Sequence, residues 1–169
     1  LEYGGTYGGA YMLRRGMFMP WELADLVGAD MARQGWRELQ PMLRLSETLT
    51  GISDPKLKVS LLEMSWYMRN QLLRDADWAG MAHSLEIRTP LVDISLLTAL
   101  LPLLRRRHAP GKKDMAISPL KSLPHAALAR KKTGFSVPVR EWMSNGTGCK
   151  QERGLRGWAR DIYRKYNDK

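Results

Sequence analysis

One helical pattern, beginning at Asp54 and Pro55, constrains the fold more than any other feature of the sequence. Asp54 is a good N-cap, because its carboxylate can accept from free N–H groups of a first turn, and Pro55 suits the first helical position. Apolar residues then recur every three or four positions, which predicts a helix with one buried stripe. The stripe consists of Leu57, Leu61, Met64, Met68 and Leu72.

Other segments carry helical patterns too. Residues 20–28 open with proline beside an acidic residue, residues 30–39 follow with Asp30 as the expected cap, and residues 93–104 form a short apolar helix capped by Asp93. Alternating apolar patterns typical of strands do not recur. The sequence therefore predicts a mainly helical chain.

The glycine-rich opening, residues 3–11, has the composition of a phosphate-binding loop but not its spacing. It contains neither Gly-Lys-Ser/Thr of the Walker type nor Gly-x-Gly-x-x-Gly. Pairs of glycine between tyrosines are typical of a helix or loop packed closely against a neighbour, and we favour this structural interpretation.

The chain carries a net charge of +10, which favours phosphates, nucleic acid or anionic lipid as partners. The basic residues form short blocks at 105–107, 112–113 and 130–132. Such blocks more often form a solvated face. Since there is no zinc-ligand spacing, RNA-binding signature or helix-turn-helix pattern, we do not expect a nucleic-acid partner.

The length of 169 residues suits one domain with a sizeable core, so we treat residues 1–169 as a single domain fragment. Residues 145–169 are expected to form a basic C-terminal tail helix, with Leu155, Trp158, Ile162 and Tyr166 on one side. Asp93 and Pro102 interrupt the most apolar stretch, so we expect no membrane segment. The single cysteine does not indicate an oxidising compartment, and a cytoplasmic location is expected.

Two segments carry a specific resemblance. Residues 72–93 read LLRDADWAGMAHSLEIRTPLVD, and residues 130–138 read RKKTGFSVP after an earlier Gly-Lys-Lys at 111–113. The first is similar to the asparagine synthetase pattern L-L-x-K-x-D-R-x-S-M-A-x-S-L-E-x-R-x-P-F-L-D. The second resembles the family's G-K segment followed by R-x-K-x-G-F-x-V-P. The resemblance covers at least residues 54–143.

The resemblance implies a place in a larger enzyme. Family members join a glutaminase domain to an adenylating domain with a parallel sheet, an S-G-G-x-D-S phosphate loop and a helical C-terminal part. The fold class implied here is that helical part of an α/β adenine-nucleotide hydrolase-like (PP-loop ATP pyrophosphatase) domain, without its nucleotide-binding sheet. The phosphate loop and the N-terminal cysteine nucleophile do not occur in the chain and would lie upstream of Leu1.

The resemblance also implies roles for individual residues. Lys132 matches the family lysine that faces the reacting acyl-phosphate, where a fixed positive charge stabilises developing negative charge. Glu86 and Arg88 match E-x-R. They either orient the acceptor amine or form a buried ion pair that locks the helix exit, and both interpretations stay open. Arg88 is also implied in binding substrate or ATP, together with Asp77, Lys112 and Lys113, of which the two lysines could equally lie on a solvated loop.

Two departures from the pattern concern the substrate. Asp75 stands where the family often has lysine, and Trp78 replaces the arginine that follows Asp77. Loss of positive charge indicates that a carboxylate is not held in the usual way, so the acceptor need not be aspartate. His83 is interpreted as a structural histidine rather than a base. No metal ligand is predicted within the chain.

By resemblance, the complete enzyme uses ATP and Mg²⁺ to form an acyl-adenylate from a carboxylate, and glutamine-derived ammonia then displaces AMP. This implies asparagine biosynthesis or amidation of a related carboxylate. The expected partners are ATP, the carboxylate, ammonia, and either further copies of the chain or the upstream synthetase segment. The alternatives are a non-catalytic remnant or partner subunit and, with support from charge alone, a nucleic-acid-binding module.

Overall fold

The computed structural model describes residues 3–106, 110, 111, 114, 124, 126, 129–131 and 155–167. Within these residues, every element with defined bounds is a helix, so the prediction of a mainly helical chain is confirmed. The chain divides into two compact units. The first is drawn from residues 1–85 and 138–169, and the second from residues 86–137.

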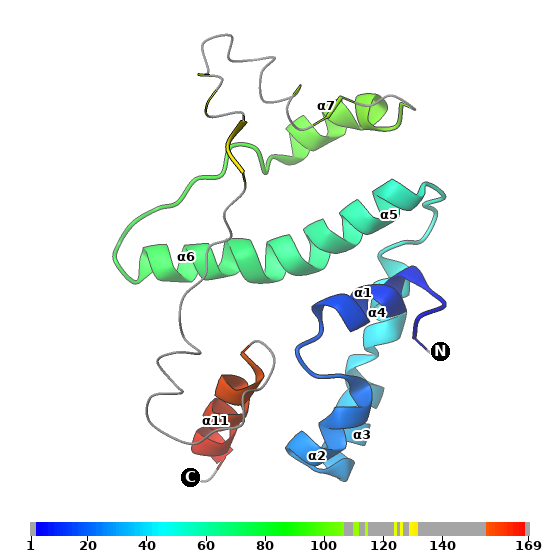
Figure 1. Cartoon of the computed structure of the whole chain (residues 1–169), viewed down its shortest axis with the longest axis vertical. Coiled ribbons are helices and arrows are strands. Elements are labelled where there is room, and N and C mark those ends of the chain that lie inside the picture. Colours follow the sequence, from blue (N-terminus) through cyan, green and yellow to red (C-terminus); the bar gives the residue numbers. More distant parts are fainter. Residues whose placement is uncertain are drawn as a thin grey trace. The chain divides into compact units, whose positions relative to one another are not determined.

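Nine helical elements with defined bounds belong to the described part of the first unit, and one to that of the second (Figure 1). Those of the first unit are α1 (Tyr7–Arg15), η1 (Pro20–Glu22), α2 (Leu23–Val27), α3 (Ala29–Leu39), α4 (Pro41–Glu47), α5 (Pro55–Leu62), η2 (Glu63–Leu73), α6 (Arg74–Met81) and α11 (Arg156–Asn167). The second unit contributes α7 (Ile94–Leu104).

The glycines of α1 allow close packing, as the sequence predicted. Thr6 caps the helix, its side chain accepting from the Gly9 N–H at 3.0 Å. A Cβ on Gly8 would lie 3.0 Å from the Cβ of Leu45 on α4, and one on Gly9 would lie 1.8 Å from the Tyr3 carbonyl oxygen. Larger residues would therefore push α1 away from α4 and from the loop that precedes it.

Left-handed backbone separates α2, α3 and α4. Gly28, at φ 87°, occupies the N-cap position of α3, and Gln40, at φ 44°, ends that helix before Pro41 begins α4. The prediction that Asp30 caps α3 is wrong, because the helix already begins at Ala29. Asp30 lies in its first turn, where it forms an ion pair with Arg33.

One long helix follows, continuous in Figure 1 from α5 through η2 to α6. Its start is confirmed, since the Asp54 carboxylate accepts from the Leu57 N–H at 2.7 Å and Pro55 is the first helical residue. The predicted buried stripe is wrong, however. None of its five residues is buried, and Leu72 is 48% exposed. Leu62 is buried instead.

The backbone form explains this shift in part. From Glu63 to Leu73 the helix takes π turns, with more residues per turn than the α-helix on which the predicted spacing was based. Leu62, which ends α5 just before these turns, and Trp66 within them belong to the cluster that packs with α1 and α4. The stripe from Leu57 to Leu72 is left half-buried or exposed.

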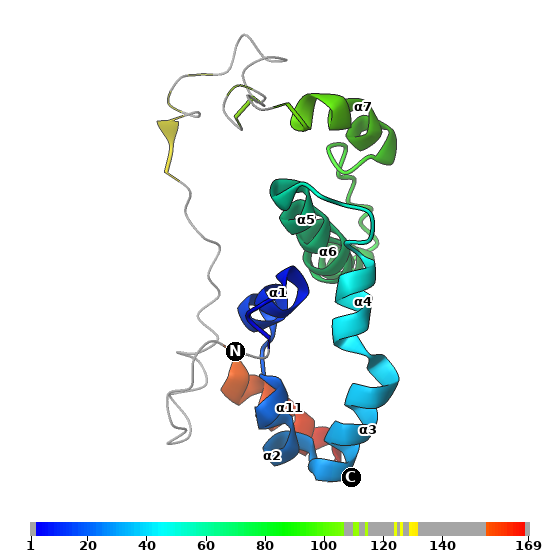
Figure 2. The same ribbon diagram turned by 90° about the vertical axis from the view of Figure 1, so that its right-hand side faces the viewer.

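The hydrophobic core of the described residues lies where α1, α4 and α5 meet (Figure 2). Tyr11, Leu45 and Leu62 are buried there. Around them pack Met12, Met42, Leu49 and Trp66. This cluster is smaller than the chain length led us to expect, because no large apolar side chain on the other described helices is buried.

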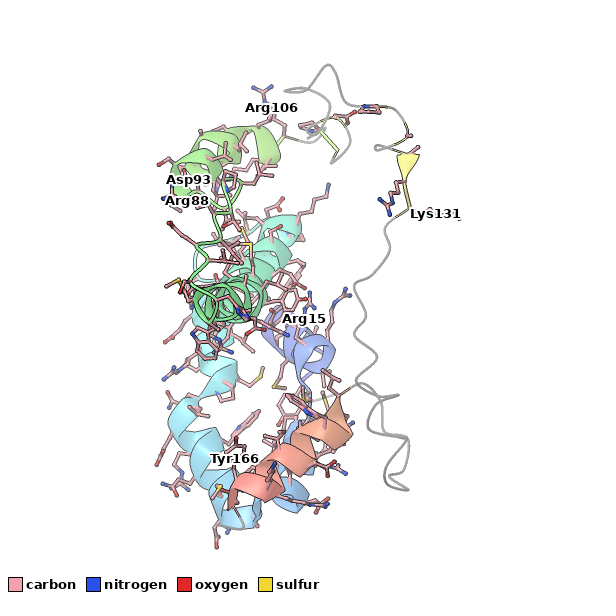
Figure 3. The ribbon with its side chains drawn as sticks, turned by 90° about the vertical axis from the view of Figure 1, so that its left-hand side faces the viewer. Arg15, Arg88, Asp93, Arg106, Lys131 and Tyr166 are labelled. Atoms are coloured by element: carbon pink, nitrogen blue, oxygen red, sulfur yellow. The ribbon has the colours of Figure 1, made fainter. Side chains whose placement is uncertain are left out.

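Polar contacts fasten α1 to η2 beside this core. The Arg15 guanidinium donates to the Glu63 carboxylate, with Nε 3.2 Å from Oε1, and lies 3.7 Å from the centre of the Tyr67 ring (Figure 3 labels Arg15). Burial, and then the nearby Glu63 charge, raise the pKa of Tyr11, so its phenol stays protonated at neutral pH.

The helix α11 contacts the 18–31 region through its basic face. Arg156 forms an ion pair with Glu22 and lies 5.0 Å from the centre of the Phe18 ring, and the Tyr163 hydroxyl lies 3.7 Å from the Met31 sulfur. The apolar side predicted for this tail faces solvent, and Tyr166, labelled in Figure 3, is 71% exposed.

In the second unit, the Asp93 carboxylate accepts from the Leu96 N–H at 2.8 Å, which confirms it as the cap of α7. No residue of α7 is buried, although the helix is almost wholly apolar. None of the described helices combines the length and the apolar character needed to cross a membrane.

Candidate functional site

The end of α6 has an unusual backbone turn within the motif-bearing segment. The Leu85 N–H donates to the Gly80 carbonyl at 2.9 Å, and the Ser84 N–H donates to the Met81 carbonyl at 3.0 Å. This is the Schellman pattern of a helix C-terminus, which glycine usually completes. Here Ser84 adopts the left-handed conformation, with φ 56°. A non-glycine residue in this region stores about 1 kcal/mol of strain.

Glu86 and Arg88 follow this turn and contact each other. The Arg88 Nε lies 3.0 Å from Glu86 Oε1 and its Nη2 lies 3.3 Å from Oε2, so the guanidinium donates to both carboxylate oxygens. The side chains are 70% and 83% exposed, respectively. The pair therefore forms, but it is not the buried lock that one of our two interpretations required.

The pair of Glu86 and Arg88 lies in the second unit, before Asp93 and α7 (Figure 3 labels Arg88 and Asp93). An exposed carboxylate–guanidinium pair contributes little to stability, since water screens the attraction. The Glu86 carboxylate and the Arg88 guanidinium are instead accessible to a ligand. Glu86 can accept hydrogen bonds from an amine, and Arg88 can donate to a carboxylate or phosphate.

The N-terminal half of α6 contains Asp77, which matches the family pattern, and the two residues that depart from it, Asp75 and Trp78. Asp77 is exposed, and so is Trp78. The Arg74 guanidinium lies 4.9 Å from the centre of the Trp78 ring and 3.9 Å from the Asp75 carboxylate. A positive charge is therefore present beside Trp78, supplied from one turn earlier in the helix. Sequence reasoning missed Arg74 as a candidate, although its spacing of four residues from Trp78 could have indicated the contact.

The remaining candidates fall largely outside the described residues. Lys112, Lys113 and Lys132 all lie outside them. Of their neighbours, Lys131 is exposed, as seen in Figure 3. Gly111 donates its N–H to the Asp114 carboxylate at 2.9 Å.

His83 is described, and it lies exposed in the turn after α6, so it is not the packed structural histidine that we expected. No group of three or more histidine, cysteine, aspartate or glutamate side chains within the described residues could hold a metal ion. A ligand set for the implied Mg²⁺ is thus not found among them.

Comparison of the sequence with models of known protein families identifies the family of this chain. The family model for asparagine synthase matches residues 12–165, which is most of the chain and includes both motif segments. The chain belongs to the asparagine synthase family.

The relatives are much longer than this chain. It is 29% identical over 108 residues to asparagine synthetase (glutamine-hydrolyzing) 1 of Bacillus subtilis, a match that covers 62% of this chain and 16% of that protein. It is also 29% identical over 125 residues to a putative glutamine-hydrolyzing asparagine synthetase of Mycobacterium bovis, covering 65% of this chain and 19% of the relative. The chain therefore spans less than a fifth of either curated relative. No solved structure matches it.

Proposed function

We propose that this chain is the helical C-terminal part of a cytoplasmic, PP-loop-type synthetase domain that forms a carboxamide at the expense of ATP. The observation that carries the proposal is the family match over residues 12–165, which includes the E-x-R pair and the lysine motif at 130–138. Both named relatives are described as glutamine-hydrolyzing asparagine synthetases. Asparagine biosynthesis, or amidation of a related carboxylate, follows as the activity of the complete enzyme.

The proposed reaction has two steps. A carboxylate oxygen attacks the α-phosphorus of ATP, and pyrophosphate leaves, giving an acyl-adenylate. Ammonia released from glutamine then attacks the acyl carbon, AMP leaves with the electrons of the acyl–oxygen bond, and the new amide loses a proton. Both steps build negative charge on oxygen, which a fixed cation stabilises. In this scheme Mg²⁺ neutralises ATP phosphate charge when it is bound.

Lys132 is the proposed cation, aimed at the reacting acyl-phosphate. Lys112 and Lys113 are proposed to lie near ATP phosphates, where a basic loop favours the anion. Glu86 is proposed to orient the incoming amine, and Arg88 to hold Glu86 in place and bind anionic substrate. The 3.0 Å contact and the exposure of this pair support a role toward a ligand.

Asp77 is proposed to bind substrate from α6. The two changes beside it, Asp75 and Trp78, support an acceptor other than aspartate. Arg74, stacked on Trp78, offers a positive charge from a different position. A carboxylate with a different shape or length would fit this rearranged charge better than aspartate does.

A second candidate is a non-catalytic partner subunit. It is favoured by one observation, the exposed apolar surface of α7 and of the segment before it, where Leu91 is 85% and Ile94 is 74% exposed. Such surface commonly marks an interface. The proposed partner is the upstream synthetase segment or another copy of the chain.

The two candidates differ in what they do to ATP. The 169-residue chain alone is expected not to release AMP and pyrophosphate, since no S-G-G-x-D-S loop is present. A longer protein that carries this segment after such a loop should release AMP in a one-to-one ratio with amide, given glutamine or ammonia and a carboxylate. Failure of an intact longer protein to form AMP with a panel of carboxylates would favour the non-catalytic candidate.

A further inference from the structure

An open groove of about 520 Å³ lies in the first unit, far in sequence from the motif segments. It is bounded by the hairpin of α2 and α3 and by the loop before α1. Its volume falls within the roughly 300–1,000 Å³ that is typical of small-molecule sites. None of the residues that line it has a role in the proposed reaction.

Small side chains keep the groove open. Gly28 reverses the chain between α2 and α3 with a φ of 87°, which L residues with a Cβ rarely adopt. Ala24 of α2 and Ala29 and Ala32 of α3 then line the space between the two arms. Because alanine fills little volume, the helices leave room that larger residues would occupy.

Three aromatic rings form the walls. The Tyr3 ring centre lies 6.3 Å from that of Trp21 and 6.2 Å from that of Trp36, with the Tyr3 and Trp36 rings at 82° to each other. Trp21 is 63% exposed. An indole held beside other rings yet left open to water offers a flat apolar surface on which a planar ring can stack.

Two arginines give the groove a positive rim. Arg33 and Arg37 also line it, four residues apart and therefore on the same side of α3. Arg33 forms an ion pair with Asp30, but the side chains are 68% and 96% exposed, so a ligand anion could compete for the guanidinium at small cost. Arg37 has no ion-pair partner within the described residues.

We propose that this groove binds a small, planar aromatic anion. The flat ring stacks on the exposed indole of Trp21, and its carboxylate or phosphate accepts hydrogen bonds from Arg37 and Arg33. A surface that only packs another protein segment would need no unpaired cation beside its aromatic rings. A phosphate-binding patch, in turn, would need no aromatic walls. The combination favours a ligand with both features.

Isothermal titration calorimetry on the 169-residue chain tests the proposal with probes that separate the two features. AMP and indole-3-acetate each combine a ring with an anion, adenosine lacks the anion, and ribose 5-phosphate lacks the ring. AMP should bind at least about tenfold more tightly than adenosine or ribose 5-phosphate. Indole-3-acetate tests whether a carboxylate can take the place of the phosphate, with indole as its counterpart without the anion. No binding by AMP or by indole-3-acetate, or equal binding by ribose 5-phosphate, would overturn the proposal.

Substitutions at residues that line the groove test whether the ligand binds there. Arg37→Gln should weaken it about tenfold, because a charge-assisted hydrogen bond is lost, and Arg37→Lys should restore part of the affinity. Trp21→Leu should weaken it about fivefold or more through lost stacking. Both positions, Arg37 and Trp21, are exposed, so the fold should survive. Arg44→Gln on α4 removes the same charge away from the groove and is the matched control. Equal losses at Arg37 and Arg44 would show general electrostatics and contradict the assignment.

Discussion

The guanidinium of Arg156 donates to the carboxylate of Glu22, which joins two residues 134 positions apart in the chain. The same carboxylate accepts from the Met19 N–H at 2.7 Å. The hydrogen bond from Arg156, followed by that from Met19, lowers the pKa of Glu22 below its ordinary value of 4.5. This carboxylate therefore couples the position of α11 to pH.

The sign of the pH effect follows from the lowered pKa of Glu22. Its contribution to stability is fully present above about pH 4.5, the ordinary value, and is lost as pH falls through the lower pKa of the folded state. The difference in unfolding free energy between the parent chain and Glu22→Gln should thus be constant near neutrality and shrink below pH 4.5. Urea unfolding across this range measures it. Glu47→Gln, an exposed carboxylate on α4, is the control, and a parallel trend there would refute the coupling.

The caps of α3 and α5 give a second prediction. Asp54→Ala should lower the free energy of unfolding by about 1 kcal/mol, because the Leu57 N–H loses its acceptor. Asp30→Ala should cost clearly less, since Gly28 rather than Asp30 occupies the cap position of α3. Chemical denaturation of both variants decides the matter. A larger loss at Asp30 than at Asp54 would contradict the assignment of Gly28 as the N-cap residue of α3.

The left-handed Ser84 gives a third prediction. Ser84→Gly should raise the unfolding free energy by up to about 1 kcal/mol, because glycine relieves the strain of φ 56° at the cost of some freedom in the unfolded chain. Ser46→Gly, in the middle of α4, should be destabilising and provides the opposite control. Comparable destabilisation at both positions would rule out the Schellman turn.

The apolar surface around α7 gives a fourth prediction. The chain should self-associate or pair with another subunit, and the double change Leu91→Ser and Ile94→Ser should weaken this association because both side chains are exposed. Analytical ultracentrifugation at moderate salt measures the effect, with Lys56→Ser as a control for an exposed polar site. A strictly monomeric parent chain at high concentration would exclude this account.

Local signals in the sequence predicted much of the fold. The carboxylates of Asp54 and Asp93 identified the starts of α5 and α7, since a cap acts within one turn and needs no tertiary information. The glycines of α1 likewise indicated close packing, and Gly8 does lie against Leu45.

The buried face of the long helix could not be predicted in the same way. Periodicity at three and four residues assumes α turns, whereas residues 63–73 take π turns, and the core contains Trp66 from this segment beside Leu62, the last residue of α5. The strained turn at Ser84 likewise depends on a backbone conformation that residue types alone do not specify. A serine is, if anything, a poor signal for left-handed backbone.

The central claim is that this segment serves ATP-dependent amide formation, with Lys132 facing the reacting phosphate. In the longer protein that joins this segment to its ATP loop, Lys132→Ala should lower the rate of AMP and amide formation by about 10²–10³, as loss of one charge-stabilising group does. Its melting temperature should change little, because the proposed role of Lys132 lies in the reaction and not in folding.

Lys131→Ala is the matched control, since it removes the same charge from the neighbouring position, and Lys131 is exposed. The decisive measurement is the steady-state rate of AMP release for the parent, Lys131→Ala and Lys132→Ala proteins, with glutamine and the accepted carboxylate present. The account predicts a rate near that of the parent for Lys131→Ala and a loss of at least about a hundredfold for Lys132→Ala. Equal losses in the two variants, or none in either, would contradict it.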